Sequence, residues 1–232
     1  MSRIPATAAA LLLTTAASAI DTCITPNTPI PDNGAQVTIP IMIAANQNEV
    51  VDSISIDLAM THSWVGDLRI ELQSPDGTTI ILLDRPGIPS MGFPGPFGCG
   101  AQGIACTFIN GATEPAESIC STTANPVITG PVIPTQPLDT FQAQPAAGTW
   151  HILITDQSPY DTGVLLEACL SITTDTPCPA DLDKNGSLDF FDVSAFLDAF
   201  ASQVPVADFT NDDRFDFFDV SAFLDAFGAG CP

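Results

Sequence analysis

The sequence predicts a mostly β protein: a β-sandwich followed by a small α-helical C-terminal module. Two patterns support this fold class. Apolar residues alternate with other residues along several stretches, and this period of two is typical of strands with one buried face. Near the C-terminus the string DFFDVSAFLDAF occurs twice, at residues 189–200 and 216–227, and its apolar residues recur with helical spacing.

The alternating stretches mark the expected strands in chain order. They cover residues 37–43, 54–60, 68–72, 150–154 and 164–172. Turn signals such as Pro75-Asp76-Gly77 separate them, and their apolar faces would meet in a two-sheet sandwich. Residues 86–145 are crowded with Pro, Gly, Thr and Ser, so we expect a long irregular insertion there and no contribution to the core.

The first residues read as a secretory signal peptide. Residues 1–19 contain one basic residue, Arg3, an apolar run, and the small residues Ala17-Ser18-Ala19 at the expected cleavage site. The apolar run is too short to cross a membrane comfortably, and no later stretch qualifies. We therefore expect an exported protein, secreted or attached to the cell surface, with a sandwich at residues 20–175 and a helical module at 176–232.

Strong acidity limits the possible partners. The chain has 27 acidic and 5 basic residues and a formal net charge of −22. A surface with this charge repels a phosphate backbone, so we expect no nucleic-acid partner. Calcium-rich surroundings or a simple need for solubility would both account for the charge.

The cysteine content predicts disulfides. Seven cysteines in an exported chain are expected to pair, but an odd number leaves at least one without an intrachain partner. The candidates are Cys23, Cys99, Cys106, Cys120, Cys169, Cys178 and Cys231.

Two pairing schemes remain open. Cys178 and Cys231 bracket the helical module and are natural partners; alternatively, Cys231 is processed or used for anchoring and all the others pair. Cys99, Cys106 and Cys120 lie in the stretch rich in Gly and Pro, where they would staple a long loop. Their spacing lacks the CxxC pairs of zinc modules, so we expect no metal there.

A calcium-binding loop precedes the first copy of the repeat. Oxygen-bearing residues fall at positions 1, 3, 5, 7, 9 and 12 of such a loop: Asp181, Asp183, Asn185, Ser187, Asp189 and Asp192. Gly186 stands where the loop must turn sharply. The alternative is that these acids only cap a helix, since Asp is favoured at helix starts. The complete ligand spacing favours Ca²⁺.

A second loop precedes the second copy and is weaker. Its candidate ligands are Asp208, Thr210, Asp212, Asp216 and Asp219. Asp213 replaces the turn glycine, and Asp tolerates a left-handed backbone better than most residues but less well than Gly. Thr210 offers a neutral oxygen in place of a carboxylate. We therefore expect a tighter first site and a weaker or absent second one.

Paired calcium loops, each followed by one helix and with Asp at the twelfth position, resemble the type I dockerin module of cellulosome proteins. Residues 178–232 resemble still more closely the dockerin-like tails, ending in Gly-Cys, of planctomycete-type secreted proteins. The resemblance implies a calcium-dependent attachment module that binds a cell-surface or scaffold receptor. Dockerins usually carry small hydroxyl residues at positions 10 and 11, where this chain has Phe190-Phe191 and Phe217-Phe218, so an ordinary cohesin partner is not expected.

Two blocks in the β part resemble a second family. They are MTHSWVGDLRIELQSPDGTTIILLD at residues 60–84 and GTWHILITDQSPYDTGVLLEACLSI at 148–172. His62, Gly66-Asp67-Leu68, Ser74-Pro75, Trp150 and Asp156 are among the carriers of a similarity to the P domain, or Homo B domain, of kexin- and furin-type proprotein convertases. The resemblance implies a jelly-roll-like sandwich that accompanies a subtilisin-like protease. Ala168-Cys169 stand where the family commonly has an aromatic residue, which suggests a disulfide with Cys23 as the candidate partner.

The protease itself is not expected in this chain. The residues beyond the sandwich and the repeat are too few for a Ser-His-Asp protease scaffold, and no Gly-x-Ser-x-Gly motif is present. His62 and His151 are the two histidines, and a structural role is expected for each. We therefore expect no enzymatic activity, and any serine endopeptidase association would come from the usual neighbour of the domain.

Three further acids and one aromatic residue suggest alternatives. Asp67, Asp156 and Asp161 would lie at one rim of the sandwich, where a second calcium ion or solvated turns are both possible readings. Trp64 could serve a glycan-binding surface, although a buried position at the end of a strand is favoured. The alternatives to a non-catalytic binding or stabilising protein are an accessory fragment of a serine endopeptidase system and a glycan-binding or carbohydrate-active sandwich.

Overall fold

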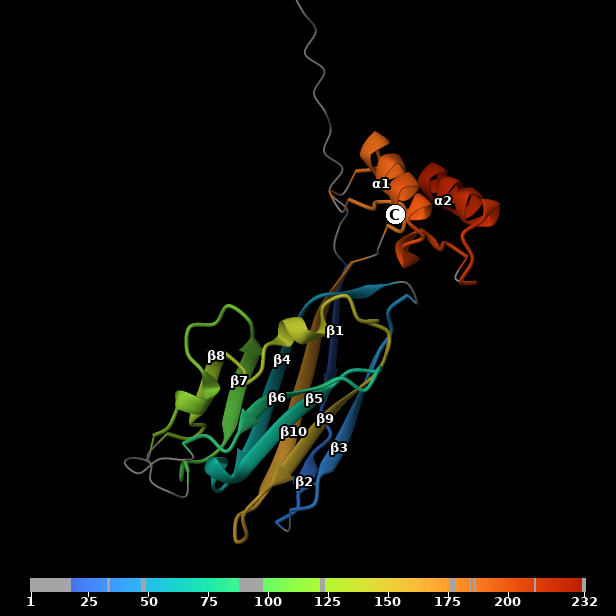
Figure 1. Ribbon diagram of the computed structural model, residues 1–232. Helices are drawn as coiled ribbons and strands as arrows, with labels where there is room; N and C mark the ends of the chain where they lie inside the picture. Colours follow the sequence, from blue (N-terminus) through green and yellow to red (C-terminus); the bar gives the residue numbers. More distant parts are fainter. Residues whose placement is uncertain are drawn as a thin grey trace, which may run out of the picture. The chain divides into compact units, whose positions relative to one another are not determined.

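The computed structural model describes residues 18–230, apart from residues 33, 47–48, 88–97, 122–123, 176–177, 184, 186 and 211. It contains two compact units, Ser18–Pro177 and a second one that includes Cys178–Pro232, both drawn in Figure 1. Residues 1–17 of the expected signal peptide lie outside the described part, and Ser18 and Ala19 begin the first strand. Among the described residues, no helix is long and apolar enough to cross a membrane.

The first unit is built from two sheets, as the sequence predicts. The larger sheet has the strand order β1-β10-β4-β7-β8, with β2 paired to β10. Its strands are β1 (Ser18–Ile24), β2 (Thr28–Ile30), β4 (Val50–His62), β7 (Ile104–Ile109), β8 (Ile128–Val132) and β10 (Gly163–Asp175). Neighbouring strands are antiparallel except for β7 and β8, which run parallel.

The smaller sheet has the strand order β3-β9-β5-β6 and is antiparallel throughout. Its strands are β3 (Val37–Ile43), β5 (Leu68–Gln73), β6 (Thr79–Asp84) and β9 (Gly148–Asp156). Short 3₁₀ helices interrupt the connections: η1 (Val65–Asp67), η2 (Ala116–Ser118) and η3 (Leu138–Phe141). Figure 1 shows β9, β5 and β6 lying in front of β10 and β4. The mostly β fold with two sheets is confirmed.

The core lies between the two sheets. The alternation that predicts β3 is visible in its burial: Ile39, Ile41 and Ile43 are buried, whereas Met42 is exposed. Trp150 on β9 is fully buried, donates its indole N–H to the Ala146 carbonyl at 3.1 Å, and meets the Phe141 ring edge-on at 5.0 Å between centroids. Removal of this apolar surface from water is the main stabilising contribution to the sandwich.

The prediction of an irregular insertion at residues 86–145 is wrong. This stretch contributes β7, β8 and η3 to the sandwich, and Phe108, Ile128 and Phe141 are fully buried. The misreading has a physical cause, because β8 contains Gly130 at a φ of 70° and Pro131. An edge strand of a sheet tolerates proline and glycine, and β8 lies at that edge.

Two disulfides join described residues of the sandwich. Cys23 on β1 is bonded to Cys169, which lies directly opposite it on β10, and Cys99 is bonded to Cys120. Cys106 is free, so the schemes in which it forms a disulfide are wrong. Its side chain points into the core from β7, and burial raises the pKa of its thiol to about 12. Cys178 is disulfide-bonded, while Cys231 lies outside the described residues.

The second unit contains the two predicted helices. They are α1 (Phe190–Ala201) and α2 (Phe217–Ala229), with the 3₁₀ helix η4 (Pro205–Ala207) between them. Phe196 and Phe223 occupy equivalent positions of the two repeats and stack face to face with ring centroids 4.1 Å apart. Both rings are buried. Each helix therefore covers an apolar side chain that the other helix could not bury alone.

The apolar face of each helix is narrower than the repeat pattern predicts. Leu197 and Leu224 belong to the predicted stripes, yet each is 55% exposed. The smaller core of this unit instead includes the fully buried Ala180 and Ala207, which come from the segments that precede the helices. Residues outside the two helices therefore form part of this smaller core.

We predict that the Cys23–Cys169 disulfide contributes strongly to the stability of the sandwich. It closes a loop with a sequence separation of 146 residues, and cross-linking such a long loop reduces the conformational entropy of the unfolded chain. Replacing both cysteines by alanine should lower the free energy of unfolding by about 2–5 kcal/mol in a urea titration. The matched control is Cys106→Ala, which removes a thiol but no cross-link. Equal stability of the two variants would contradict the prediction.

We also predict that the half-buried carboxylate of Glu117 lowers the stability of the sandwich at neutral pH. Burial raises its pKa, although its carboxylate accepts hydrogen bonds from the Thr135 hydroxyl and the Asp84 backbone N–H. The native state therefore holds a proton above the unfolded-state pKa of about 4.3, and stability falls as the pH rises through the window between the two pKa values.

Glu117→Gln keeps an accepting oxygen and removes the charge. The variant should therefore unfold at a higher temperature than the parent at pH 7, and the difference should vanish near pH 4. The matched control is Glu114→Gln at an exposed position. A variant that is less stable at pH 7, or a difference that is independent of pH, would argue against the assignment.

Candidate functional site

The loop before α1 brings three of its predicted calcium ligands together. Single carboxylate oxygens of Asp181, Asp183 and Asp192 all lie within 4.8 Å of one another. Asp181 and Asp183 come from the loop, and Asp192 comes from the first turn of α1. Oxygen donors at this separation suit a hard cation such as Ca²⁺, whereas zinc prefers nitrogen and sulfur ligands.

Backbone hydrogen bonds hold this loop in a tight turn. The Asn185 N–H donates to carboxylate oxygens of both Asp181 and Asp183, each at 3.1 Å. The Ser187 N–H donates to the side-chain oxygen of Asn185 at 2.8 Å. These contacts aim the carboxylates of alternate residues at the inside of the turn, and Gly186 itself lies outside the described residues.

Asp192 connects the loop to the helix. One of its oxygens accepts from the Leu182 N–H at 2.8 Å, and the other accepts from the Asp189 N–H at 2.9 Å. Asp189 in turn accepts from the Phe191 N–H, so that the two residues form a capping box. The hydrogen bond from the Asp189 N–H, followed by those from the loop, lowers the pKa of Asp192 although the side chain is buried. A buried anion therefore stands at the base of the loop.

The second loop repeats this arrangement with one difference. Asp219 accepts from the Asp216 N–H at 2.9 Å, and this hydrogen bond is the main reason that its pKa is lowered. Its other oxygen accepts from both the N–H and the hydroxyl of Thr210. Within the part of this loop that the structure describes, no three carboxylate oxygens lie within 4.8 Å of one another.

Asp213 takes the left-handed backbone conformation that the loop requires. Its φ is 60°, and its N–H donates to Asp208 at 2.9 Å. The Asp212 N–H donates to the other oxygen of Asp208 at 3.2 Å. The loop thus closes without glycine, at the cost of a conformation that disfavours residues with a Cβ atom.

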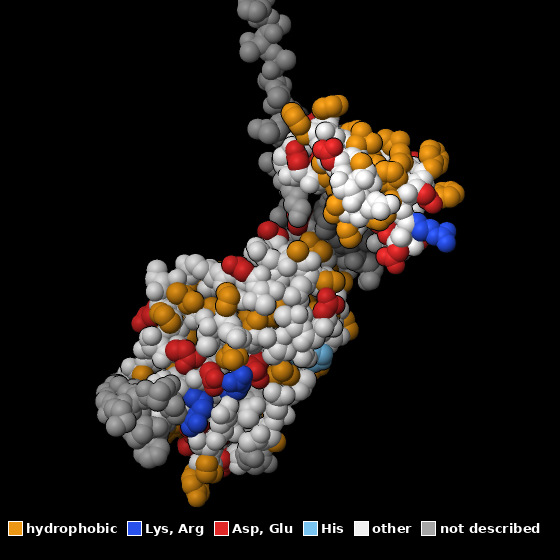
Figure 2. All heavy atoms as spheres, viewed as in Figure 1, with side chains coloured by type: hydrophobic (Ala, Val, Ile, Leu, Met, Phe, Trp, Pro, Cys, Tyr) orange, Lys and Arg blue, Asp and Glu red, His pale blue; other side chains and the backbone are white. Residues whose placement is uncertain are grey.

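Four phenylalanine side chains project from the helical unit into solvent. Phe190, Phe191, Phe217 and Phe218 are between 65% and 76% exposed. They occupy the first two positions of α1 and α2, and Figure 2 shows that apolar side chains gather on the surface of this unit. Aromatic side chains exposed in this number are typical of a surface that contacts another molecule.

A buried polar cluster lies at one rim of the sandwich, around His62. His62 Nε2 is 3.3 Å from Asp156 Oδ2, which is an ion-pair distance without the geometry of a hydrogen bond, and both side chains are fully buried. His62 Nδ1 lies 2.8 Å from the Trp64 carbonyl oxygen. The Ser63 hydroxyl donates to Asp161 at 2.7 Å and not to the histidine. His62 is therefore held between two structural partners, in an arrangement unlike that of a nucleophile and its base.

The three rim acids lie close enough to influence one another. Burial raises the pKa of Asp67, and the charges of Asp156 and Asp161 raise it further, against a hydrogen bond from Ser158 and the charge of Arg85. Within the described residues, these three acids do not form a group whose oxygens all lie within 4.8 Å. Arg85 and Ser158 were missed by the sequence analysis, because no motif marks them and only the fold brings them together.

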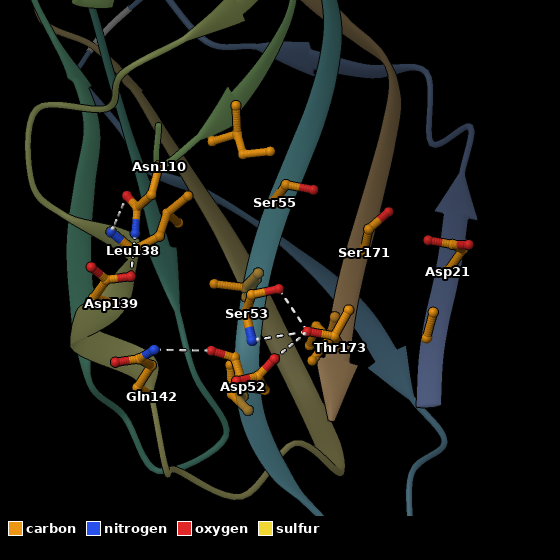
Figure 3. Close-up of a pocket in the computed structure, with 15 residues that line it drawn as sticks. Asp21, Asp52, Ser53, Ser55, Asn110, Leu138, Asp139, Gln142, Ser171 and Thr173 are labelled. Carbon is orange, nitrogen blue, oxygen red and sulfur yellow. Dashed lines mark hydrogen bonds between the residues drawn. The ribbon is translucent and has the colours of Figure 1, made fainter. Parts of the chain in front are cut away.

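A depression, shown in Figure 3, crosses the outer face of the larger sheet between η3 and β1. Its polar side chains mostly bond to one another. The Thr173 hydroxyl meets the Ser53 hydroxyl at 2.6 Å and donates to Asp52 at 3.1 Å, and Gln142 donates to the Asp52 carbonyl at 3.2 Å. These internal hydrogen bonds reduce the capacity of the depression to bind a ligand.

Comparison with known proteins links the sandwich to one family. Residues 51–91 match the family model described as proprotein convertase P-domain. Over 50 residues the chain is 42% identical to the transglutaminase-activating metalloprotease of Streptomyces mobaraensis, a match that covers 22% of this chain and 6% of that protein. The P-domain resemblance of the sandwich is thus supported over the segment that contains most of β4, together with β5 and β6.

Two solved structures are also similar. The serine protease of Aeromonas sobria aligns with a TM-score of 0.42 and 18% identity, over 68% of this chain and 27% of that chain. The complex of the same protease with its chaperone aligns with a TM-score of 0.39 and 16% identity. This chain therefore spans about a quarter of the solved protease and a small fraction of the metalloprotease.

We predict that His62 stabilises the sandwich. His62→Ala would leave the Asp156 carboxylate buried without its partner, which should lower the free energy of unfolding by about 3 kcal/mol. His151→Ala is the matched control, because His151 is the other histidine and is only half-buried on β9. Chemical unfolding followed by intrinsic fluorescence measures both. The prediction is wrong if His62→Ala lowers the free energy of unfolding by no more than His151→Ala does.

Proposed function

We propose that this chain is an exported, non-catalytic protein made of two functional parts. In this proposal the sandwich binds or stabilises another protein in the manner of a P domain. The helical unit is a calcium-dependent attachment module that resembles a dockerin. The two disulfides formed in the sandwich support an oxidising, extracellular setting.

The observation that carries the proposal for the sandwich is the family match at residues 51–91. This segment includes His62 and Asp67 and ends beyond β6, so it spans strands of both sheets together with the buried rim. The P domain is a non-catalytic domain that accompanies a protease. The arrangement around His62 supports the same interpretation, because its Nδ1 lies against the Trp64 carbonyl and the neighbouring Ser63 hydroxyl donates to Asp161.

A second candidate follows from the same match: an accessory role in a protease system. The metalloprotease of Streptomyces mobaraensis shares a short similar segment with this chain, and the matched domain is named after the proprotein convertases. In this alternative the sandwich would meet a protease supplied by another chain and increase its stability. Co-purification with a protease from the same extracellular fluid, together with a slower loss of its activity on heating, would support it.

The proposal for the helical unit rests on the convergence of Asp181, Asp183 and Asp192. When bound, a calcium ion would supply the positive charge that neutralises these carboxylates, with Asn185, Ser187 and Asp189 as the remaining oxygen donors of the loop. The folded loop would bind calcium and the unfolded chain would not, so calcium would stabilise the unit by linkage.

The exposed phenylalanines support the attachment role. Phe190 and Phe191 of α1 have the same exposure as Phe217 and Phe218 of α2 to within a few per cent, and each pair directly follows the Asp that caps its helix. Calcium-dependent folding of the loops would therefore position both pairs. A cell-surface or scaffold receptor with an apolar surface is the proposed partner.

A calcium titration of the metal-stripped full-length protein tests this proposal. Calorimetry should show saturable binding of one or two ions, and far-UV circular dichroism should show a gain of helix. Asp181→Asn combined with Asp183→Asn should weaken binding at least about tenfold, because it removes two charges from the loop. The amide oxygens can still accept from the Asn185 N–H, so the turn itself is preserved.

The matched control makes the same change of charge elsewhere in the unit. Asp198 on α1 and Asp225 on α2 are exposed, and replacing both by Asn should leave calcium affinity nearly unchanged. A second double variant, Asp208→Asn with Asp212→Asn, distinguishes one occupied loop from two. The proposal fails if the parent protein shows no saturable binding, or if the first-loop variant binds as tightly as the control.

A further inference from the structure

A pocket of about 410 Å³ lies at the rim of the sandwich, beyond the last residues of β4, β6 and β9. Two aromatic and four polar side chains are among those that line it: Trp64, Tyr160, Arg85, Asp67, Ser158 and Asp161. Its volume falls within the range of about 300–1,000 Å³ that small-molecule sites occupy. Neither proposed role of the chain uses this pocket.

Backbone strain is concentrated at this pocket. Arg85 and Tyr160 both have positive φ, 54° and 90°, which is unfavourable for residues with a Cβ atom. Hydrogen bonds hold each of them there: the Arg85 N–H donates to the Leu68 carbonyl at 2.8 Å, and the Tyr160 N–H donates to both oxygens of Asp32 at 2.9 Å. Strained residues that the surrounding structure fixes in this way are concentrated at binding sites.

The aromatic side chains are placed where a ligand can reach them. Tyr160 is 92% exposed although its backbone is held by Asp32. Trp64 is half-buried, and its indole ring lies against Gly100. A Cβ atom at Gly100 would come within 2.7 Å of the ring, so glycine leaves the room that the indole needs. The pocket therefore offers an accessible, flat apolar surface at its edge and a second aromatic wall behind it.

The polar groups present both a donor and acceptors. The Arg85 guanidinium donates to the Ser158 hydroxyl at 3.2 Å, and Ser158 is hydrogen-bonded to Asp67. Arg85 Nε is buried and has no hydrogen-bond partner within the part of the chain that the structure describes. Asp161 accepts a hydrogen bond from the Ser63 hydroxyl and has further acceptor capacity as a carboxylate.

The aromatic and polar groups together indicate the class of ligand. A sugar ring has an apolar C–H face that packs against an aromatic side chain such as Tyr160. Each of its hydroxyl groups can accept one hydrogen bond, as from Arg85, and donate another, as to Asp161. We propose that this pocket binds a neutral saccharide unit, with its C–H face against Tyr160 and its hydroxyl groups between Arg85 and Asp161.

Tryptophan fluorescence provides a direct test with the full-length protein. The chain has 2 tryptophans, and Trp150 is fully buried in the core, so a ligand-dependent change reports Trp64. The probes are the methyl glycosides of common neutral hexoses and N-acetylhexosamines. At least one should cause a saturable change in emission. Tyr160→Ala and Arg85→Lys should each weaken its binding by up to about tenfold.

The control variant is Met42→Ala. Met42 is exposed and lies opposite Thr149, at the other end of β9 from the pocket, so saccharide affinity should not change. Circular dichroism verifies that each variant is folded, and Arg85→Lys, which keeps the charge, serves if Tyr160→Ala does not fold. The proposal is overturned if no glycoside binds saturably, if both variants bind like the control, or if calcium or N-acetylarginine amide saturates the pocket and glycosides do not.

Discussion

The antiparallel pairing of β4 with β10 is the constraint on which the rest of the sandwich depends. Both strands are 13 residues long, and they form the centre of the larger sheet, with β1 and β2 added on one side and β7 on the other. At the rim this pairing places His62 directly opposite Gly163. A Cβ atom at Gly163 would approach the Thr61 carbonyl to 2.4 Å and the His62 ring to 2.5 Å, so glycine is required for the histidine to reach Asp156.

The helical unit depends on a different interaction, the acceptance of backbone N–H groups by aspartates. Asp192 and Asp219 each tie a loop to the first turn of a helix, and each pair of hydrogen bonds keeps an anion buried. The same carboxylates are the twelfth-position ligands in the proposed calcium loops. Helix capping and metal binding therefore use one set of atoms, which explains why the alternative of simple capping could not be separated from calcium binding by spacing alone.

Elements whose sequence pattern has a local physical cause were predicted correctly. Strict alternation predicted β3 and β9, and the repeated i, i+3, i+4, i+7 spacing predicted α1 and α2. The prediction failed for β8, where Gly130 and Pro131 obscure an edge strand, and for the neighbouring β7. It also failed for Leu197 and Leu224, which are more than half exposed. The pairing of Cys23 with Cys169 was suggested by family resemblance, since spacing alone leaves many pairings open.

By itself the sequence determined the strands and helices whose apolar residues recur at a regular spacing. It also determined the ligand spacing of the first loop and the acidity that disfavours nucleic acid. Only the tertiary structure decided which distant residues meet. Asp32 holds the Tyr160 backbone across a sequence separation of 128 residues, and Arg85 meets Ser158 across 73. Such contacts depend on the order of strands in two sheets, and no local property of the chain encodes that order.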